Sequence, residues 1–274
     1  MPDRSRPPEC AVPPALRPAA WGAALLVLAS GLTACSLLAV SGDRTPLGTP
    51  ATVRPPKQVL LSATQTLDDT GGARVRTVEE GPAGRRTAAG TVVWGPRDAA
   101  ELTVTDERGT GRLRSQDGTV DLGYEGAAPL RAERAEAESL DPRAAPGVGG
   151  YAGGWMTGLI SNPGDSAHTM ALAGRLTSLG GEELAGTTVA HYQGSAPVAE
   201  YFAADQGLTP ERLAVVLGYY REHGVTAIGY DAWIAPGDRL LRLRATAVGS
   251  AGTVVTTTDV SELGTGTESP APAG

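Results

Sequence analysis

Residues 230–245 read YDAWIAPGDRLLRLRA, two apolar segments on either side of a Pro-Gly-Asp turn. Turn residues between two short apolar segments are typical of a β-hairpin. In the second segment, Leu241, Leu243 and Ala245 alternate with two arginines. Because successive side chains of a strand point to opposite faces, we expect the three apolar residues on a covered face and the arginines in solvent. The hairpin therefore predicts an antiparallel sheet with one solvated side.

Short alternating segments lie on both sides of this hairpin. Gly252–Val260 follows it, and several strand-like segments precede it, separated by turn pairs such as Arg108-Gly109 and Asp117-Gly118. Turns at such close spacing favour an antiparallel meander over crossover connections. The preceding strands are expected at Thr91–Trp94, Leu102–Val104, Leu113–Ser115 and Val120–Tyr124.

Two amphipathic helices are expected to cover the sheet. The first follows Pro55-Pro56 and ends at Gly71-Gly72, and the second begins at Thr209 and ends at Gly224. Thr followed by Pro is a favourable helix start, and glycine is common just after a helix end. The apolar faces consist of Leu60, Leu61, Thr64 and Leu67 in the first helix and of Leu213, Val216, Leu217 and Tyr220 in the second.

The N-terminal segment has the organisation of a bacterial export signal. An uncharged stretch follows three arginines, and its apolar part, Trp21–Leu32, has the length of a secretory h-region. It runs into Leu-Thr-Ala-Cys at residues 32–35, the small residues and cysteine of a lipobox. We therefore expect a lipoprotein signal peptide over residues 1–34 and acylation of Cys35. The alternative is an uncleaved signal anchor, because the apolar run continues past the cysteine to Val40.

Composition divides the rest of the chain into three parts. Residues 35–56 are rich in Gly, Pro, Thr and Ser, as expected of a flexible tether, and residues 264–274 form a low-complexity tail that we expect to be disordered. Residues 57–263 remain for a single folded domain. The formal net charge of −7 argues against nucleic acid as a partner and against attraction to anionic headgroups. The acyl chains on Cys35 are therefore expected to hold the protein at the membrane.

The sequence offers few groups for catalysis, redox chemistry or metal binding. Cys10 would be lost with the signal peptide, and Cys35 would become a thioether. His168, His191 and His223 have no partner at the spacing of a metal-binding motif, and no GxSxG, Walker or strand-linked GxGxxG motif is present. We therefore predict a protein that is not an enzyme and that needs neither a metal nor a cofactor.

Residues 176–194 read LTSLGGEELAGTTVAHYQG, in which a G-x-E turn motif begins at Gly181 and a T-x-x-H-Y strand covers Thr188–Tyr192. Together with the hairpin at 230–245, this segment resembles the LppX and LprAFG family of actinobacterial envelope lipoproteins. The order of lipobox, tether, helix, meander, helices and final hairpin extends the resemblance over residues 35–263.

The resemblance implies an α+β fold of the LolA type. In that fold one strongly curved antiparallel sheet forms a half-barrel, and helices cover its concave face with an apolar cavity between them. The better-known members of the family carry lipids or glycolipids across the envelope. Shielding an acyl chain from water avoids a cost of about 0.8 kcal/mol per CH₂, so such a carrier needs no catalytic residue.

We therefore expect a lipoprotein, anchored on the extracytoplasmic face of the cell membrane, that binds or carries a lipid or glycolipid. The alternative is an anchored binding or sensing module that contacts an envelope protein, such as a signalling partner, without lipid cargo. The second helix is expected to lie over the concave face with Leu241 and Leu243 beneath it. The expected cavity residues are Leu60, Leu67, Leu213, Val216, Leu217, Tyr220, Leu241 and Leu243.

Overall fold

The computed structural model describes residues 54–134, 157–205 and 207–265. The expected signal peptide, the lipidation site Cys35, nearly all of the tether and most of the tail lie outside the described residues. The described helices and strands fall within Pro56–Ser261.

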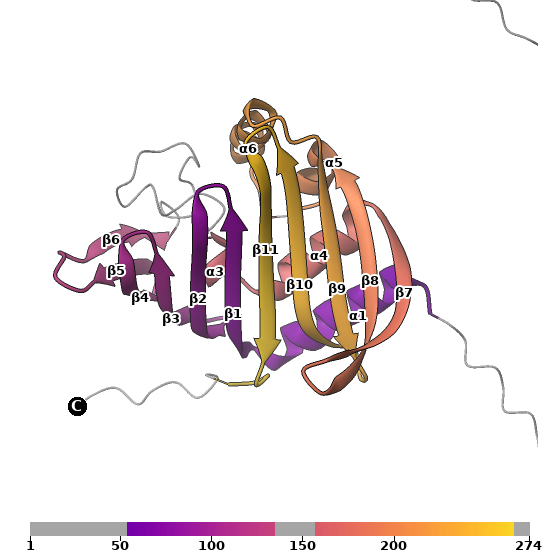
Figure 1. Ribbon diagram of the computed structural model, residues 1–274. Coiled ribbons are helices and arrows are strands. Elements are labelled where there is room, and N and C mark those ends of the chain that lie inside the picture. Colours follow the sequence, from indigo (N-terminus) through magenta and orange to yellow (C-terminus); the bar gives the residue numbers. More distant parts are fainter. Residues whose placement is uncertain (1–53, 135–156, 206, 266–274) are drawn as a thin grey trace, which may run out of the picture. The chain divides into compact units, whose positions relative to one another are not determined.

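Eleven strands form one antiparallel sheet in the described part of the chain. Their order is β6-β5-β4-β3-β2-β1-β11-β10-β9-β8-β7 (Figure 1). Strands that are neighbours in the sheet also follow each other in the chain, except for β1 and β11. The expected meander is therefore confirmed. The strands are β1 (Gly72–Gly81), β2 (Gly84–Val93), β3 (Ala99–Asp106), β4 (Gly109–Gln116), β5 (Thr119–Tyr124), β6 (Leu130–Glu133), β7 (Arg175–Leu184), β8 (Thr187–Pro197), β9 (Ala227–Ala235), β10 (Arg239–Gly249) and β11 (Gly252–Ser261).

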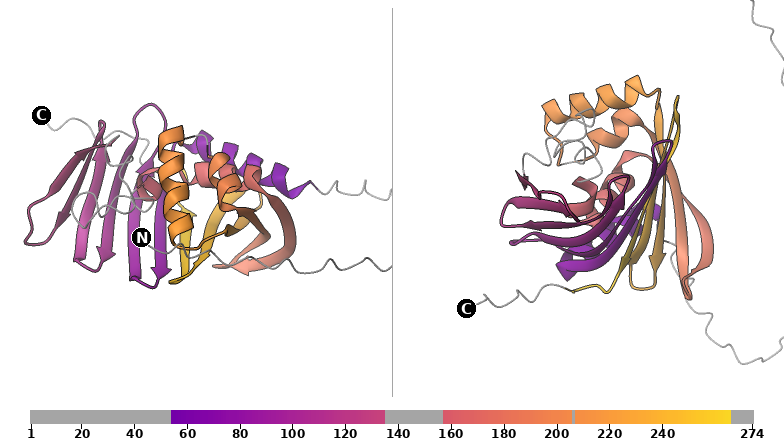
Figure 2. Two further views of the ribbon diagram at one scale, coloured as in Figure 1. Left: turned by 90° about the horizontal axis from the view of Figure 1, so that it is seen from above. Right: turned by 60° about the vertical axis from the view of Figure 1, so that its left-hand side comes forward.

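Helices cover one face of this sheet, which curves strongly around them (Figure 2). We call the covered face the inner face and the opposite one the outer face. The α+β class, with a curved antiparallel sheet and helices on its concave face, is thus confirmed. The helices are α1 (Pro56–Thr70), α3 (Thr157–Ile160), α4 (Pro163–Ala173), α5 (Val198–Ala203) and α6 (Pro210–Glu222).

Both helices predicted from the sequence form, and local residues set their ends. α1 has Pro56 in its first turn and ends where Gly71 adopts a φ of 69°. This left-handed backbone conformation favours glycine. α6 begins at Thr209, whose side chain accepts a hydrogen bond from the Arg212 N–H, and Gly224 follows its end with a φ of 69°. Proline and glycine therefore fix the ends of α1, and a threonine cap and glycine fix those of α6.

Two apolar clusters lie on the inner face. The larger one packs α1, α4 and α5 against β1 and β8 to β11. The smaller one packs Leu159 and Ile160 of α3 against β1 to β6. Trp94, just after β2, contacts both clusters. The two halves of the sheet therefore share one covered face.

A β-bulge in β10 changes the alternation expected for the closing hairpin. The register of β10 against β9 shifts between Leu240 and Arg242, so one extra residue is inserted there. Leu240 and Leu243 are 1% and 4% exposed in the inner-face core, whereas Leu241 packs with Trp233 on the outer face. The prediction that Leu241 and Leu243 share a face is therefore wrong, because the extra residue shifts the strand's alternation by one.

Leu240→Ala and Leu241→Ala test this register. Truncating the buried Leu240 leaves a cavity in the core, so we expect the free energy of unfolding to fall by about 2–5 kcal/mol. Leu241 is only partly buried, and its truncation should cost less than about half as much. Denaturant unfolding followed by circular dichroism measures both losses. A larger loss for Leu241→Ala would contradict the register shift.

Candidate functional site

The helices cover the centre of the inner face unevenly. In one cross-strand row, Leu243, Ala232 and Tyr192 lie side by side and are buried in the larger core. In the next row towards the β10–β11 turn, Ala245 lies directly opposite Thr256, and both are partly exposed. On β10 the close helix cover therefore ends between these two rows.

Helix α6 lies at this less covered end of the inner face (Figure 2). Its main packing partner is α5, and Leu217 and Tyr220 contact the margin of the larger core. Within α6 only Gly218 is fully buried, while Leu213 and Val216 are partly exposed like Leu217 and Tyr220. The apolar side chains of α6 are therefore largely, but not completely, covered by protein.

Contacts near its C-terminal end hold α6 in place. The backbone N–H of Ser250, in the β10–β11 turn, donates a hydrogen bond of 2.8 Å to the His223 carbonyl. The ring of Tyr220 lies 5.0 Å from that of Phe202 in α5, measured between centroids. We call the half-buried apolar side chains of α6 and of the adjoining strands the α6 layer. It comprises Leu213, Val216, Leu217, Tyr220, Ala245, Ala247 and Val254.

The eight residues predicted to line one cavity fall into three groups. Leu60, Leu67 and Leu243 are buried in the larger core. The four predicted residues of α6 belong to the α6 layer. Leu241 lies on the outer face. The prediction that α6 lies over the concave face is confirmed. The prediction that Leu241 lies beneath it is wrong, because the bulge turns Leu241 outward, and α1 packs on β10, which carries Leu243.

A charged cluster borders the α6 layer on β1 and β2. Glu79 stands directly opposite Arg86 and belongs to the same cross-strand row as Thr256. The Arg86 guanidinium lies 3.8 Å from the Glu79 carboxylate and 3.3 Å from that of Glu107. Burial raises the pKa of Glu79, although the Arg86 charge opposes this shift. Burial also raises the pKa of Tyr220 on α6 to about 12.

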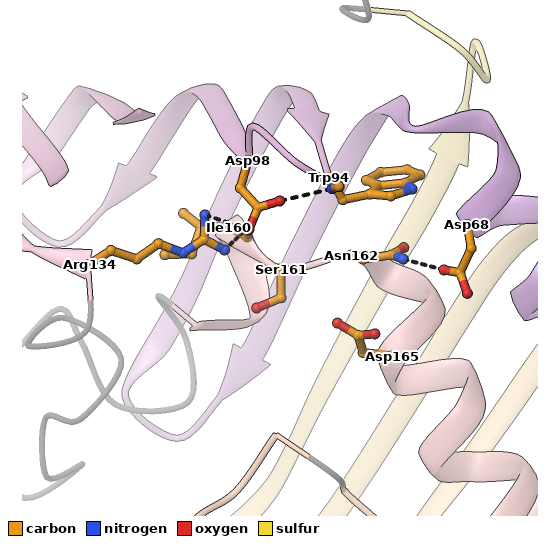
Figure 3. Close-up of a pocket in the computed structure, with 9 residues that line it drawn as sticks. Asp68, Trp94, Asp98, Arg134, Ile160, Ser161, Asn162 and Asp165 are labelled. Carbon is orange, nitrogen blue, oxygen red and sulfur yellow. Dashed lines mark hydrogen bonds and ion pairs between the residues drawn. The ribbon is translucent and has the colours of Figure 1, made fainter. Parts of the chain in front are cut away.

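A polar recess of about 460 Å³ lies between the end of α1, the β2–β3 turn and the junction of α3 with α4 (Figure 3). Its side chains bind one another: Asn162 caps α4 and donates a 2.5 Å hydrogen bond to Asp68. Arg134 lies 3.5 Å from Asp98, which also accepts a hydrogen bond from the Gly95 N–H. We interpret this recess as a structural junction between the two halves of the fold.

The outer face carries a buried polar network that sequence reasoning missed. The Nε2 atom of His191 lies 2.9 Å from one Asp231 oxygen, and Arg244 donates to the other at 2.9 Å. The His191 ring stacks on Trp233 with centroids 4.4 Å apart, and its Nδ1 atom lies 3.6 Å from Glu182. Both ring nitrogens thus face carboxylates instead of a nucleophile, unlike the histidine of a hydrolase triad. The signals in the sequence were the polar side of the alternating hairpin and the histidine of the T-x-x-H-Y segment.

Asp231→Asn tests this network through its dependence on pH. Burial by itself would raise the pKa of Asp231, but hydrogen bonds from His191, Arg244 and Gln193 outweigh it and lower the pKa below 3.8. Such a carboxylate stabilises the fold above its unfolded pKa, and this stability is lost as the pH falls through the folded value. We therefore expect Asp231→Asn to melt at a lower temperature than wild type at pH 7, with the difference shrinking below about pH 4. Thermal unfolding between pH 7 and pH 2 measures this difference, and a constant gap would contradict the assignment.

The described part of the chain contains neither a group of metal ligands nor a helix that could span a membrane. Within residues 54–134, 157–205 and 207–265, no three His, Cys, Asp or Glu side chains converge as metal ligands would. In the same part of the chain, no helix combines the length and the apolar character needed to cross a membrane. The acylation of Cys35 concerns a residue outside this part and stays a prediction.

No protein-family model matches this sequence, and no curated protein matches it. Similar solved structures include the lipoprotein LppX of Mycobacterium tuberculosis, with 13% identity and a TM-score of 0.45 over 76% of this chain and 96% of that one. LprF of Mycobacterium bovis shows 15% identity and a TM-score of 0.47 over 80% and 97% of the two chains. A chain of the MucA/MucB complex from Pseudomonas aeruginosa shows 11% identity and a TM-score of 0.35 over 76% and 56%. LppX and LprF bear the names of the family that the sequence resembles.

Proposed function

We propose that this protein is a lipid-anchored lipoprotein of the cell envelope that binds a lipid or glycolipid in the α6 layer. The observation that carries the proposal is the half-buried apolar surface of two neighbouring elements, with Leu213, Val216 and Leu217 on α6 and Ala245 and Ala247 on β10. Removing such surface from water lowers the free energy of the protein. An acyl chain between α6 and the sheet would cover the apolar side chains of both α6 and β10.

The same contact also lowers the free energy of the lipid. Each methylene removed from water contributes about 0.8 kcal/mol, so ten methylenes contribute roughly 8 kcal/mol. Part of this gain offsets the freedom that the lipid and the side chains lose on binding. Because α6 is held near its C-terminal end, its first turns can move outward to admit a chain while α1 stays packed on the sheet.

The N-terminal segment supports a location at the membrane. The lipobox that ends at Cys35 would give a diacylated N-terminus on the extracytoplasmic face, and two or more acyl chains suffice for stable anchoring. The acidic net charge of −7 supplies no attraction to anionic headgroups, so the anchor itself has to hold the protein there.

Cys35→Ala tests the anchor. We expect this variant to lose metabolic labelling by a palmitate analogue and to leave the membrane fraction or remain unprocessed, because the acylated thiol is gone. Cys10→Ala is the matched control and should keep both the label and the membrane location. Label that persists in the Cys35→Ala protein would contradict the assignment.

Photo-crosslinking of the full chain in cells tests the lipid site. Cells fed a photoactivatable, clickable palmitate build it into their lipids, and illumination joins these lipids to the residues that they touch. We expect label on the tryptic peptide 213–221 of α6. Leu217→Glu should reduce this label about tenfold or more, because it places a carboxylate against the acyl chain.

Ala214→Glu is the control for this experiment, because Ala214 is exposed on the same helix. Its label on peptide 213–221 should remain close to that of wild type. Label on the Cys35 peptide reports the anchor separately. A wild-type chain without label on α6 would overturn the lipid proposal and favour the alternative, an anchored module that contacts an envelope protein.

A further inference from the structure

Glu79, Arg86 and Glu107 form the charged border of the α6 layer. Glu79 and Arg86 stand opposite each other on β1 and β2, and their cross-strand row continues through Thr256 to Ala245. Within this row, the side chains therefore change from the apolar Ala245 to the charged pair Glu79 and Arg86. An amphiphile whose acyl chain lies against Ala245 finds partners for its polar end at this border.

The cluster carries a net negative charge. One guanidinium, that of Arg86, contacts two carboxylates, Glu79 at 3.8 Å and Glu107 at 3.3 Å. The side chains of Glu79 and Arg86 are only 25% and 27% exposed, so water screens their charges in part. A phosphate placed here would have to displace a carboxylate from Arg86 or lie beside it.

Hydroxyl groups surround the same place. The hydroxyls of Thr77 and Thr258 lie 3.2 Å apart in the adjoining row, and Thr256 stands opposite Glu79. On α6, burial raises the pKa of Tyr219; the negative charge of Glu79 adds to this shift and the positive charge of Arg86 opposes it. Threonine and tyrosine hydroxyls both donate and accept hydrogen bonds, and carboxylates accept them. This set of groups matches the hydroxyls of glycerol or a sugar.

Given the lipid site proposed above, we propose that this cluster selects lipids whose headgroup is uncharged and bears hydroxyls, and rejects lipids with an anionic headgroup. Glu79 and Glu107 accept hydrogen bonds from hydroxyl groups and repel a phosphate. The selection depends on the net negative charge of the cluster, in which two carboxylates face the single guanidinium of Arg86.

Two photoactivatable, clickable lipids with identical acyl chains test this selection. One is a diacylglycerol and the other a phosphatidylglycerol, each added to phosphatidylcholine vesicles that carry the purified full-length, anchored protein. We expect the diacylglycerol to label peptide 213–221 about tenfold more strongly than the phosphatidylglycerol. In the double variant Glu79→Gln, Glu107→Gln, the two yields should come within about twofold, because Arg86 is then free to bind the phosphate.

Glu80→Gln is the matched control. Glu80 is the next residue on β1, points to the outer face and pairs with Arg85 at 3.3 Å, so its variant should keep the wild-type ratio. Diacylglycerol labelling of each variant reports that its site is still formed. Equal labelling of wild type by the two lipids, or a double variant with the wild-type ratio, would overturn headgroup selection and leave the lipid site standing. No label from either lipid would overturn both proposals.

Discussion

The pairing of β1 with β11 is the interaction on which the rest of the structure depends. It places Thr77 opposite Thr258, 181 positions later in the chain, whereas every other described strand pair joins consecutive strands. Without it, β1 to β6 and β7 to β11 would be two separate meanders. With it, they present one curved inner face on which the helices pack. Strands this far apart in the chain pair only after a large loss of chain entropy, so this pairing also influences the folding rate.

The helices use this shared face in two different ways. α1 directly precedes β1 and buries Leu60 and Leu67 almost completely, which makes a firm core beneath the centre of the sheet. α6 is held near its C-terminal end and leaves Leu213 and Leu217 half-covered above a surface of small side chains such as Ala245. A rigid part and an adaptable part thus adjoin each other on one sheet. This combination suits a protein that takes up an apolar ligand without unfolding.

The outer face contributes stability that the hairpin pattern did not suggest. Arg242 and Arg244, expected in solvent, lie within 5.8 Å and 5.4 Å of the centroid of the Trp233 ring. Arg242 donates to Asp259 at 2.5 Å, and Arg244 donates to the buried Asp231. These bonds join β10 to β11 and to β9, so they hold the register of β10 against both neighbouring strands just after the bulge. These ion pairs lie on the outer side of β9 to β11, and α6 covers the inner side of β10 only in part.

The sequence by itself determined the local elements of this protein. Prolines, glycines and the Thr209 cap fixed α1 and α6, and turn pairs predicted the meander, because hydrogen bonds and backbone conformations within a few residues decide these features. Only the tertiary structure decided that β1 pairs with β11, that a bulge sends Leu241 to the outer face, and that Glu79, Arg86 and Glu107 meet beside α6. Each of these three features depends on how strands pair or on contacts between residues far apart in the chain. The alternation of apolar and polar residues along a single strand does not reveal which strand it pairs with or in which register.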